Sequence, residues 1–438
     1  MNTLEQTTQL AIELIKQQKV SDFEISVGKS SGVSTTVRLS NVETLQYHLD
    51  TSFNVSVYIG KNKGQATSVD LSKASLKNAI ESACLIAKYT QEDPFNGLAP
   101  SERMAWDSPN LDLYYPWNLD AKQSIEIAKE CEQIALEQSE INNSDGAELS
   151  SFEGESVYAN SNGLIANLKS SRHSLYCSLI AKRGDEMQTA YEYSVAIDSN
   201  DLTAPSKIGL EAARLAQEKL GSRHLSPQKC PIIFTSRQSS GIFSQLLGAL
   251  SGSRQYKKTS FLLESLGSKV LPESISIYED PLKLKTLGSR AFDQDGVLKQ
   301  KQFFVEEGIV SSYLMGQYSA NQMGLESTAN AGGVSNCCVN SNFDGGITEL
   351  TKSMDRGLIV TDLMGHGVNA TTGDYSRGAS GFWVENGEIK YPVSGITIAG
   401  NLKDMLKNIV SIASDVDFRS NLKVGSTLIS EMTISGEG

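Results

Sequence analysis

The sequence predicts an α+β fold, with helices and antiparallel strands in its first half and a mostly β region after it. Residues 5–18 place Leu10, Leu14 and Ile15 at helical spacing, which indicates an amphipathic helix. The stretches that follow, "FEISVG", "STTVRLS", "VETLQYH" and "NVSVYIG", alternate apolar and polar residues between Gly, Ser and Asn, as antiparallel strands do. In the second half, strand-like runs in glycine-rich sequence outnumber helical ones.

In the first half, the predicted order of a helix, strands and a helix occurs twice. A helix over 75–90 with Leu76, Ile80 and Cys84 inward completes the first set, and the proline-containing segment 91–118 has no periodicity and is typical of a connector packed on the surface. The second set is predicted as a helix, two strand regions and a helix over 119–139, 145–160, 173–195 and 206–221. This order predicts an N-terminal α+β domain over 1–224, with similar halves 1–115 and 116–224.

Two prolines in "LSPQKCPIIF" precede a strand and place the main boundary there, so 225–438 is predicted as a β-rich C-terminal domain. It contains a helix near 237–251 and a later one near 401–413. Within "VENGEI", Asn386-Gly387 between alternating residues predicts a tight β-hairpin.

Charge and composition exclude several classes of protein. The 438 residues carry a formal charge of −12, which repels phosphate backbones and argues against a direct nucleic-acid partner. No run of 18 apolar residues and no apolar leader occur, so neither a membrane partner nor export is expected, and a cytoplasmic location is predicted. The six cysteines lack CxxC spacing, which favours reduced, mostly buried thiols.

One stretch, "MGHGVNATTGDYSRGASGFW" at 364–383, gathers chemically active residue types. Gly365, Gly367 and Ala370 fit G-x-G-x-x-A after a strand, but loop residues follow where a dinucleotide site needs a helix. Glycine clusters also shape tight β corners, and this structural reading is as well supported as a functional one.

The same stretch could also carry a metal site or a hydrolase. The four histidines are far apart, so a metal site would have to combine His366, Asp362 and Asp374 from separate elements. An independent hydrolase would need His366, Asp374 and a serine in hydrogen-bond reach. Asp374 and Arg377 are expected to form an ion pair that stiffens the loop.

Several long motifs resemble one known family. They are "SSGIFSQLLGALSGSRQYKKTSFLLESLGSKVLP", "AFDQDGV", "YSANQMGLESTANAGG" and "LMGHGVNATTGDYSRGASGFWVENGEIKYPVSGITIAGNLKDM". With these motifs the chain resembles the TldD/PmbA family, in its PmbA (TldE) branch, over nearly its whole length. The resemblance implies a cytoplasmic two-subunit metalloprotease whose TldD-type subunit carries zinc on an H-E-x-x-x-H helix, with a late cysteine as a further ligand. There, a glutamate takes the proton from the zinc-bound water.

This sequence departs from that zinc pattern. Alignment of "FSQLLGALSG" by its shared glycine puts Ser244, Gln245 and Ala249 at the positions of His, Glu and His, and the last cysteine is Cys338. The resemblance therefore implies no catalytic or metal-ligating residue in this chain. The helix is expected to be a scaffold with Leu246 and its apolar neighbours on one face, and with Gly248 and Gly252 permitting close packing.

The resemblance then implies a non-metal subunit of a heterodimeric zinc metalloprotease, inactive alone, with zinc in a TldD-like partner. It would form a chamber that admits unfolded peptides, and His366, Asp374 and Arg377 are the candidate chamber contacts. The isolated chain could form a homodimer, since related subunits often pair symmetrically. The alternative function is a non-enzymatic binding or regulatory protein, a modulator of gyrase or of a toxin–antitoxin system.

Overall fold

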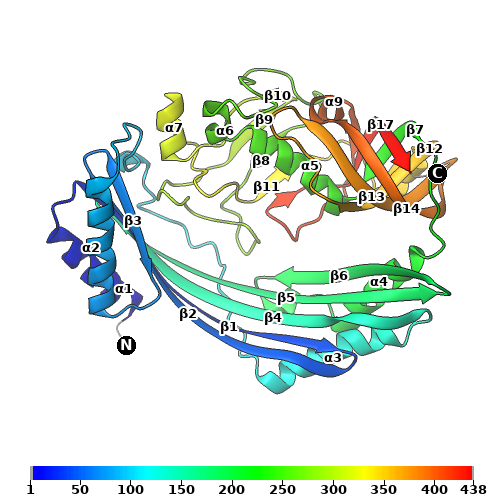
Figure 1. Ribbon diagram of the computed structural model, residues 1–438, viewed down its shortest axis with the longest axis horizontal. Coiled ribbons are helices and arrows are strands. Elements are labelled where there is room, and N and C mark those ends of the chain that lie inside the picture. The colour runs from blue at the N-terminus through cyan, green and yellow to red at the C-terminus, as the bar shows by residue number, and fades with distance from the viewer. Residues whose placement is uncertain (1–2, 437–438) are drawn as a thin grey trace.

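The computed structural model describes residues 3–436 and confirms the predicted α+β class (Figure 1). The N-terminal part is one antiparallel sheet in the order β3-β2-β1-β4-β5-β6. Its strands are β1 (Asp22–Arg38), β2 (Asn41–Ile59), β3 (Asn62–Ser68), β4 (Ile141–Asn160), β5 (Ile165–Arg183) and β6 (Glu186–Ala196). The helices are α1 (Leu4–Lys16), α2 (Lys73–Tyr89), α3 (Ala121–Leu136) and α4 (Pro205–Glu218), with the 3₁₀ turns η1 (Ser101–Arg103) and η2 (Ser199–Asp201). The sheet is strongly curved, with the helices outside it and the C-terminal part on its inner side (Figure 1).

The order helix, three strands, helix occurs twice, and the two sets meet where β1 pairs with β4. Each helix pair covers an apolar cluster of its own. Phe53 and Val55 pack under α1 and α2, and Leu149 and Leu175 pack under α3 and α4. The predicted helices of this half end within a few residues of the observed ones, because local periodicity specifies them.

The strands are longer than predicted, since "FEISVG" and the first five residues of "STTVRLS" are parts of the single strand β1. Gly32 lies inside β1, and Phe152 of β4 lies opposite it. A Cβ at Gly32 would lie 2.4 Å from Phe152 Cδ1. The glycine therefore makes room for an aromatic ring from the neighbouring strand, which the alternation pattern alone does not show.

The β1–β2 turn is held by a buried carboxylate. Leu39 and Ser40 have φ angles of 48° and 63°, a conformation that costs free energy for residues other than glycine. Both oxygens of Glu132 on α3 accept hydrogen bonds from the Leu39 and Ser40 amides, at 2.8 Å each. The helix α3 thus fixes the turn at the end of the β1–β2 hairpin.

The connector packs more deeply than a surface loop. Its residues Ala99, Met104 and Leu111 are buried in one cluster with Phe292 and Val297 of the C-terminal part. This segment therefore links the two parts of the protein.

The C-terminal part contains two sheets, ordered β14-β13-β12-β7-β17-β15 and β10-β9-β8-β11-β16. Because β14 also pairs with β17, five strands of the larger sheet form a closed ring. The strands of the two sheets are β7 (Gln228–Phe234), β8 (Ile277–Glu279), β9 (Gln302–Glu306), β10 (Ile309–Val310), β11 (Cys337–Val339), β12 (Arg356–Met364), β13 (Asp374–Glu385), β14 (Glu388–Asn401), β15 (Ile409–Ile412), β16 (Leu422–Lys423) and β17 (Thr427–Gly436). The helices are α5 (Ser236–Ala249), α6 (Gly252–Tyr256), α7 (Gln317–Met323), α8 (Ile347–Lys352) and α9 (Leu402–Lys407).

The predicted hairpin in this part is confirmed, and the late helix is only partly correct. Asn386 and Gly387 have φ angles of 55° and 73°, as the tight turn between β13 and β14 requires. The helix predicted over 401–413 ends at Lys407, because Ile409–Ile412 pairs with β17 as a strand.

Ion pairs connect the N-terminal sheet with the C-terminal part. Lys285 Nζ lies 2.8 Å from Asp198 Oδ2, and Arg237 Nη2 lies 2.9 Å from Glu192 Oε2. The start of α5 is thereby attached to the edge strand β6. No helix within residues 3–436 has the length and apolar character needed to cross a membrane.

Candidate functional site

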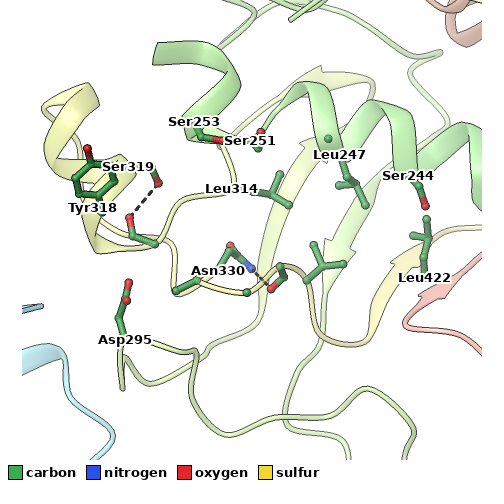
Figure 2. Close-up of a pocket in the computed structure, with 16 residues that line it drawn as sticks. Ser244, Leu247, Ser251, Ser253, Asp295, Leu314, Tyr318, Ser319, Asn330 and Leu422 are labelled. Atoms are coloured by element: carbon green, nitrogen blue, oxygen red, sulfur yellow. Dashed lines mark hydrogen bonds between the residues drawn. The ribbon is translucent and has the colours of Figure 1, made fainter. Parts of the chain in front are cut away.

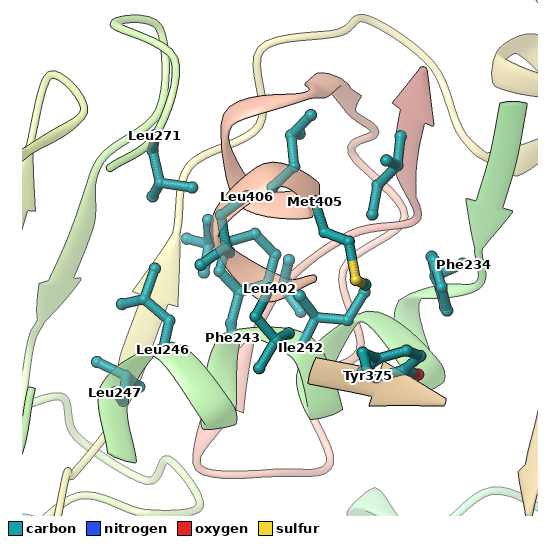
Figure 3. Close-up of a cluster of buried hydrophobic side chains, with 14 of the residues drawn as sticks. Phe234, Ile242, Phe243, Leu246, Leu247, Leu271, Tyr375, Leu402, Met405 and Leu406 are labelled. Carbon is teal, nitrogen blue, oxygen red and sulfur yellow. The ribbon is translucent and has the colours of Figure 1, made fainter. Parts of the chain in front are cut away.

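Helix α5 is the element around which the candidate site is built. It follows β7, which lies inside the larger sheet and runs parallel to β12. Its side chains Ile242, Phe243 and Leu246 are buried and pack near Leu402 and Met405 of α9 (Figure 3). This confirms the predicted apolar stripe, which fixes the helix so that its other face is free to line a cavity.

A cavity of about 520 Å³ lies beside the C-terminal half of α5 (Figure 2). Ser244 and Asp295 lie toward opposite ends of it in Figure 2. The residues that line it come from α5, α6, α7, the strand β16 and the loops near them: Ser244, Leu247, Gly248, Ser251, Ser253, Asp295, Leu314, Gly316, Tyr318, Ser319, Asn330, Ala331, Gly332, Gly333, Val334 and Leu422. Since hydroxyls, an amide and a carboxylate interrupt an apolar surface, the cavity can accept hydrogen bonds from a ligand.

Asp295 is the carboxylate of this cavity, and its loop is rigidly held. Its Oδ2 accepts the amide hydrogen of Gln317 at 2.7 Å, and burial raises its pKa. Behind it, the two oxygens of Asp293 accept backbone hydrogens of Asp295, Val297 and Ala331, each at 3.0 Å. Burial and the neighbouring Asp295 raise the pKa of Asp293 to about 7.

A buried ion pair supports the wall on which Asn330 lies. Lys299 Nζ is 3.1 Å from Glu279 Oε1, and the two side chains are 1 % and 0 % exposed. Asn330 Nδ2 donates to Glu279 Oε2 at 3.0 Å, and Gln302 Nε2 donates to the same oxygen at 3.0 Å. The orientation of Asn330 in the cavity wall therefore depends on a charged group that has no access to water.

The three positions aligned with the zinc motif have different environments. Ser244 is exposed in the cavity, Gln245 is half-buried, and Ala249 is fully buried in the core. A methyl group and an amide cannot replace imidazole and carboxylate, so these residues do not fit a zinc ion. Within residues 3–436, His, Cys, Asp and Glu side chains nowhere gather in a group of three that could hold a metal ion.

The two glycines of this region differ. A Cβ at Gly252 would lie 2.6 Å from Met315 Cγ, so the predicted close packing is confirmed there. A Cβ at Gly248 would have no atom within 4 Å. The prediction of close packing at Gly248 is wrong, because this residue faces the cavity instead of a neighbouring element.

His366 and Asp374 lie elsewhere: His366 is on the loop between β12 and β13, and Asp374 is the first residue of β13. Both are exposed and border a second hollow of about 540 Å³ that shares no lining residue with the α5 cavity. Ser376 borders it as well, but within the described chain no hydrogen bond joins the His366 ring to Asp374 or to a serine. The arrangement therefore lacks the contacts of a hydrolase triad.

The predicted ion pair between Asp374 and Arg377 is wrong. Asp374 accepts hydrogen bonds from Thr372 Oγ1 at 2.6 Å and Asn401 Nδ2 at 3.2 Å, and these contacts lower its pKa. Both residues lie on β13 three positions apart, so their side chains leave opposite faces of the strand. Arg377 is half-buried and borders neither hollow.

The other interpretations of this loop also fail on geometry. The loop after Gly365 leads into the strand β13 instead of a helix, so it lacks the helix N-terminus that binds a dinucleotide. Asp362 Oδ2 lies 2.9 Å from Lys219 Nζ and accepts from Thr361. Asp362 is thus paired within the protein and does not border the hollow at His366.

Sequence reasoning missed Asp295, Tyr318 and Asn330 as cavity residues. They come from separate segments that only the folded chain brings together. A signal was present, since two of the motifs that carry the family resemblance, "AFDQDGV" and "YSANQMGLESTANAGG", contain all three.

Comparisons with known proteins agree over nearly the whole chain. Models of the PmbA/TldA metallopeptidase family match as domain 1 at 23–87, central domain at 114–220 and C-terminal domain at 227–436. "Metalloprotease PmbA homolog" of Haemophilus influenzae is 45 % identical over 434 residues, covering 99 % of this chain and 96 % of that protein. "Metalloprotease PmbA" of Escherichia coli is 41 % identical over 435 residues, with the same coverage. "Metalloprotease TldD homolog" of Buchnera aphidicola is 23 % identical over 402 residues, covering 84 % and 80 %.

Two solved structures share the fold. A "putative modulator of DNA gyrase" from Bacteroides thetaiotaomicron superposes with a TM-score of 0.92 at 26 % identity, covering 99 % of both chains. TldE from Thermococcus kodakarensis superposes with a TM-score of 0.85 at 21 % identity, covering 98 % of this chain and 100 % of that one.

Proposed function

This chain belongs to the PmbA branch of the PmbA/TldD metallopeptidase family, and from that premise we propose that it is the non-metal subunit of a heterodimeric zinc peptidase. Its partner is a TldD-like subunit that holds the zinc. The observation that carries the proposal is the donor set of α5, where the three aligned positions present a serine hydroxyl, a carboxamide and a buried methyl group.

In this proposal the chain supplies a wall and not the chemistry. Ser244, Asn330 and Asp295 line a cavity whose only charged side chain among its lining residues is a carboxylate. Hydroxyl, amide and carboxylate oxygens accept hydrogen bonds, so they suit the N–H groups of an unfolded peptide. His366, Asp374 and Arg377 are weaker candidates for contacts to the same peptide, because none of them borders this cavity.

Reconstitution tests the proposal directly. The purified chain should contain no stoichiometric zinc and should not cleave unfolded peptides. Addition of a TldD-like subunit from the same cell should produce cleavage that a chelator abolishes and zinc restores. One zinc per isolated chain, or chelator-sensitive cleavage by the chain alone, would overturn the proposal.

A second matched comparison locates the peptide contact. Ser244→Asp adds a negative charge on the exposed wall of the cavity, whereas Asp374→Asn changes an exposed carboxylate at the other hollow. If the α5 cavity holds the peptide, the first change raises KM of the reconstituted complex and the second leaves it unaltered. The opposite pattern would place the peptide at the loop between β12 and β13.

A binding or regulatory role is the second candidate, since a structural relative at 26 % identity carries the description of a gyrase modulator. Affinity purification from a lysate lacking the TldD-like subunit distinguishes the two. Stoichiometric retention of gyrase or of a toxin–antitoxin component under those conditions would favour this second role.

A further inference from the structure

The α5 cavity ends at a carboxylate that has one oxygen without a partner. Asp295 lines the cavity, and its Oδ2 accepts the Gln317 amide hydrogen at 2.7 Å. A Cβ at Gly316 would lie 2.8 Å from the same oxygen, so a glycine there lets the carboxylate pack against the start of α7. Within residues 3–436, Asp295 Oδ1 has no hydrogen-bond partner and is not sealed from solvent. Because an ionised carboxylate accepts hydrogen bonds through both oxygens, Oδ1 can bind a ligand in the cavity.

Acidic groups outnumber basic ones around Asp295. Burial raises the pKa of Asp293 and of Glu24 on β1, and the charge of Asp295 raises both pKa values further, so the three carboxyl groups lie close together. Lys63 Nζ lies 3.9 Å from Glu24 Oε2. Lys299, on the other side, is already paired with Glu279. A positively charged ligand would therefore offset an excess of negative charge at this end of the cavity.

An aromatic ring and a further carboxylate lie at the same end. Tyr318 follows Gln317 directly and lines the cavity, and Figure 2 shows it on the side of Asp295, far from Ser244. Its hydroxyl donates a hydrogen bond to Asp93 Oδ2 at 2.6 Å, which fixes the ring. The same hydrogen bond lowers the pKa of Asp93, so this second carboxylate stays ionised. The face of a tyrosine ring also attracts cations.

The wall between the two ends of the cavity is apolar. Figure 2 shows Leu247 and Leu314 between Ser244 and Asp295. Lysine and arginine side chains have an aliphatic stem that packs on apolar surface and a charged end that needs a polar partner. A divalent metal ion instead needs several oxygen ligands, and within residues 3–436 no three acidic, histidine or cysteine side chains are grouped to hold one. The cavity thus suits an organic cation with an apolar stem.

We propose that the Asp295 end of the α5 cavity binds a positively charged group of the peptide, with Asp295 Oδ1 as its acceptor and the Tyr318 ring beside it. The apolar wall at Leu247 and Leu314 would hold the stem of that residue. This inference rests on the proposed function and names its substrate class: unfolded peptides that present a lysine or arginine side chain or a free N-terminal ammonium group.

The selectivity comes from the cost of covering Asp295. A peptide that fills the cavity removes water from this carboxylate, and a neutral residue offers it no charge in return. A charged hydrogen-bond donor restores the lost interaction, which corresponds to about a tenfold difference in affinity. A glutamate at the same position would add repulsion. Basic peptides should therefore bind most tightly and acidic ones most weakly.

The first experiment measures peptide binding to the intact isolated chain by fluorescence. The probes are three ten-residue Ala/Ser peptides with a dansyl group on the N-terminus and a central lysine, norleucine or glutamate. The Kd of the lysine peptide should be about tenfold lower than that of the norleucine peptide, and salt should reduce the difference. A norleucine peptide with a free N-terminus and a C-terminal label shows whether an ammonium group at the chain end serves equally well. Equal Kd values for all four peptides would overturn the proposal.

Variants assign the preference to Asp295. Asp295→Asn keeps an oxygen for the Gln317 amide, and it should bring the Kd values of the lysine and norleucine peptides together while the circular-dichroism spectrum stays unchanged. Glu273→Gln is the control, because Glu273 is a carboxylate with a 79 % exposed side chain that does not line the cavity. Ser244→Asp, at the other end, lengthens a wall side chain and should weaken both peptides without removing the preference. A lysine preference that survives in Asp295→Asn, or that either other variant abolishes, would refute the assignment.

The reconstituted complex separates this inference from the proposed function. Zinc-dependent cleavage in which the lysine and norleucine peptides have equal KM would keep the proposed function and overturn the subsite. A lysine preference in binding to the isolated chain, without cleavage after the TldD-like subunit is added, would keep the subsite and overturn the peptidase role. Both stand if KM for the lysine peptide is about tenfold lower and Asp295→Asn removes that difference.

Discussion

Lys299→Met is expected to be among the most destabilising single changes in the C-terminal part. At 3.1 Å between Lys299 Nζ and Glu279 Oε1, the Coulomb attraction is about 5 kcal/mol at an effective dielectric constant near 20. The methionine preserves most of the stem but leaves the carboxylate buried, with only the neutral donors Gln302, Asn330 and Ser335. Because breaking a buried pair leaves an uncompensated charge, the loss should be about 3–5 kcal/mol.

Urea unfolding followed by tryptophan fluorescence measures this loss, since Trp383 is buried in the C-terminal core. With a slope of about 2–3 kcal/mol per molar urea, the midpoint should fall by roughly 1–2 M. Lys283→Met is the control, because its ammonium lies 3.7 Å from Asp280 Oδ2 at a partly exposed site. That change should cost no more than about 1 kcal/mol.

Two outcomes would refute the reasoning. Equal midpoints for Lys299→Met and the parent would show that the pair contributes nothing to stability. In addition, the double variant Lys299→Met with Glu279→Gln should lose less than the sum of the two single losses, because each single variant leaves one buried charge unpaired and the double variant leaves none. A strictly additive result would mean that the two side chains act independently.

Three further predictions concern other parts of the chain. Gly32→Ala should lower the thermal midpoint by several degrees, corresponding to about 1–3 kcal/mol, because the added Cβ would lie 2.4 Å from an aromatic ring. Gly241→Ala, in a helix with open space around it, should raise the midpoint slightly. Calorimetry that finds the reverse order of the two midpoints would contradict this prediction. Glu132→Ala should cost about 2–3 kcal/mol in urea unfolding, since two backbone amides lose their acceptor, and no loss would show that the turn does not need this carboxylate. Asp293 has a pKa raised to about 7, so its contribution to stability is fully present below about pH 4 and is lost as the pH rises through about 7. Asp295→Asn should reduce that loss in thermal scans at different pH values, because Asp295 is one cause of the raised pKa. An unchanged pH profile of the thermal midpoint would refute the interaction between the two carboxylates.

The predicted helices were largely correct because their information is local. Three or four apolar residues on one face specify α1 or α5 without reference to distant segments. Long strands are different, because the continuity of β1 through Gly32 depends on Phe152, which is 120 positions away in sequence. A glycine seen alone suggests an interruption, and only its partner strand shows that it makes room for a ring.

The same difference between local and long-range information applies to the candidate site. The exposed position of Ser244 and the burial of Ala249 agree with a scaffold helix that the sequence could indicate. Asp295 and Asn330 could not be assigned to one cavity, since separate loops bring them together. The ion pair expected between Asp374 and Arg377 failed because spacing in sequence was considered without the alternation of side chains along β13.

The pairing of β1 with β4 also determines the order in which the protein can fold during synthesis. β1 ends at Arg38, and β4, which pairs with it over fourteen positions, does not begin until Ile141. At a usual rate of translation, about 5–20 residues per second, roughly 100 residues of delay correspond to about 5–20 s. Throughout that interval the nascent chain exposes the inner edge of its first hairpin. This period, rather than any state of the finished protein, is when a ribosome-associated chaperone would protect it most.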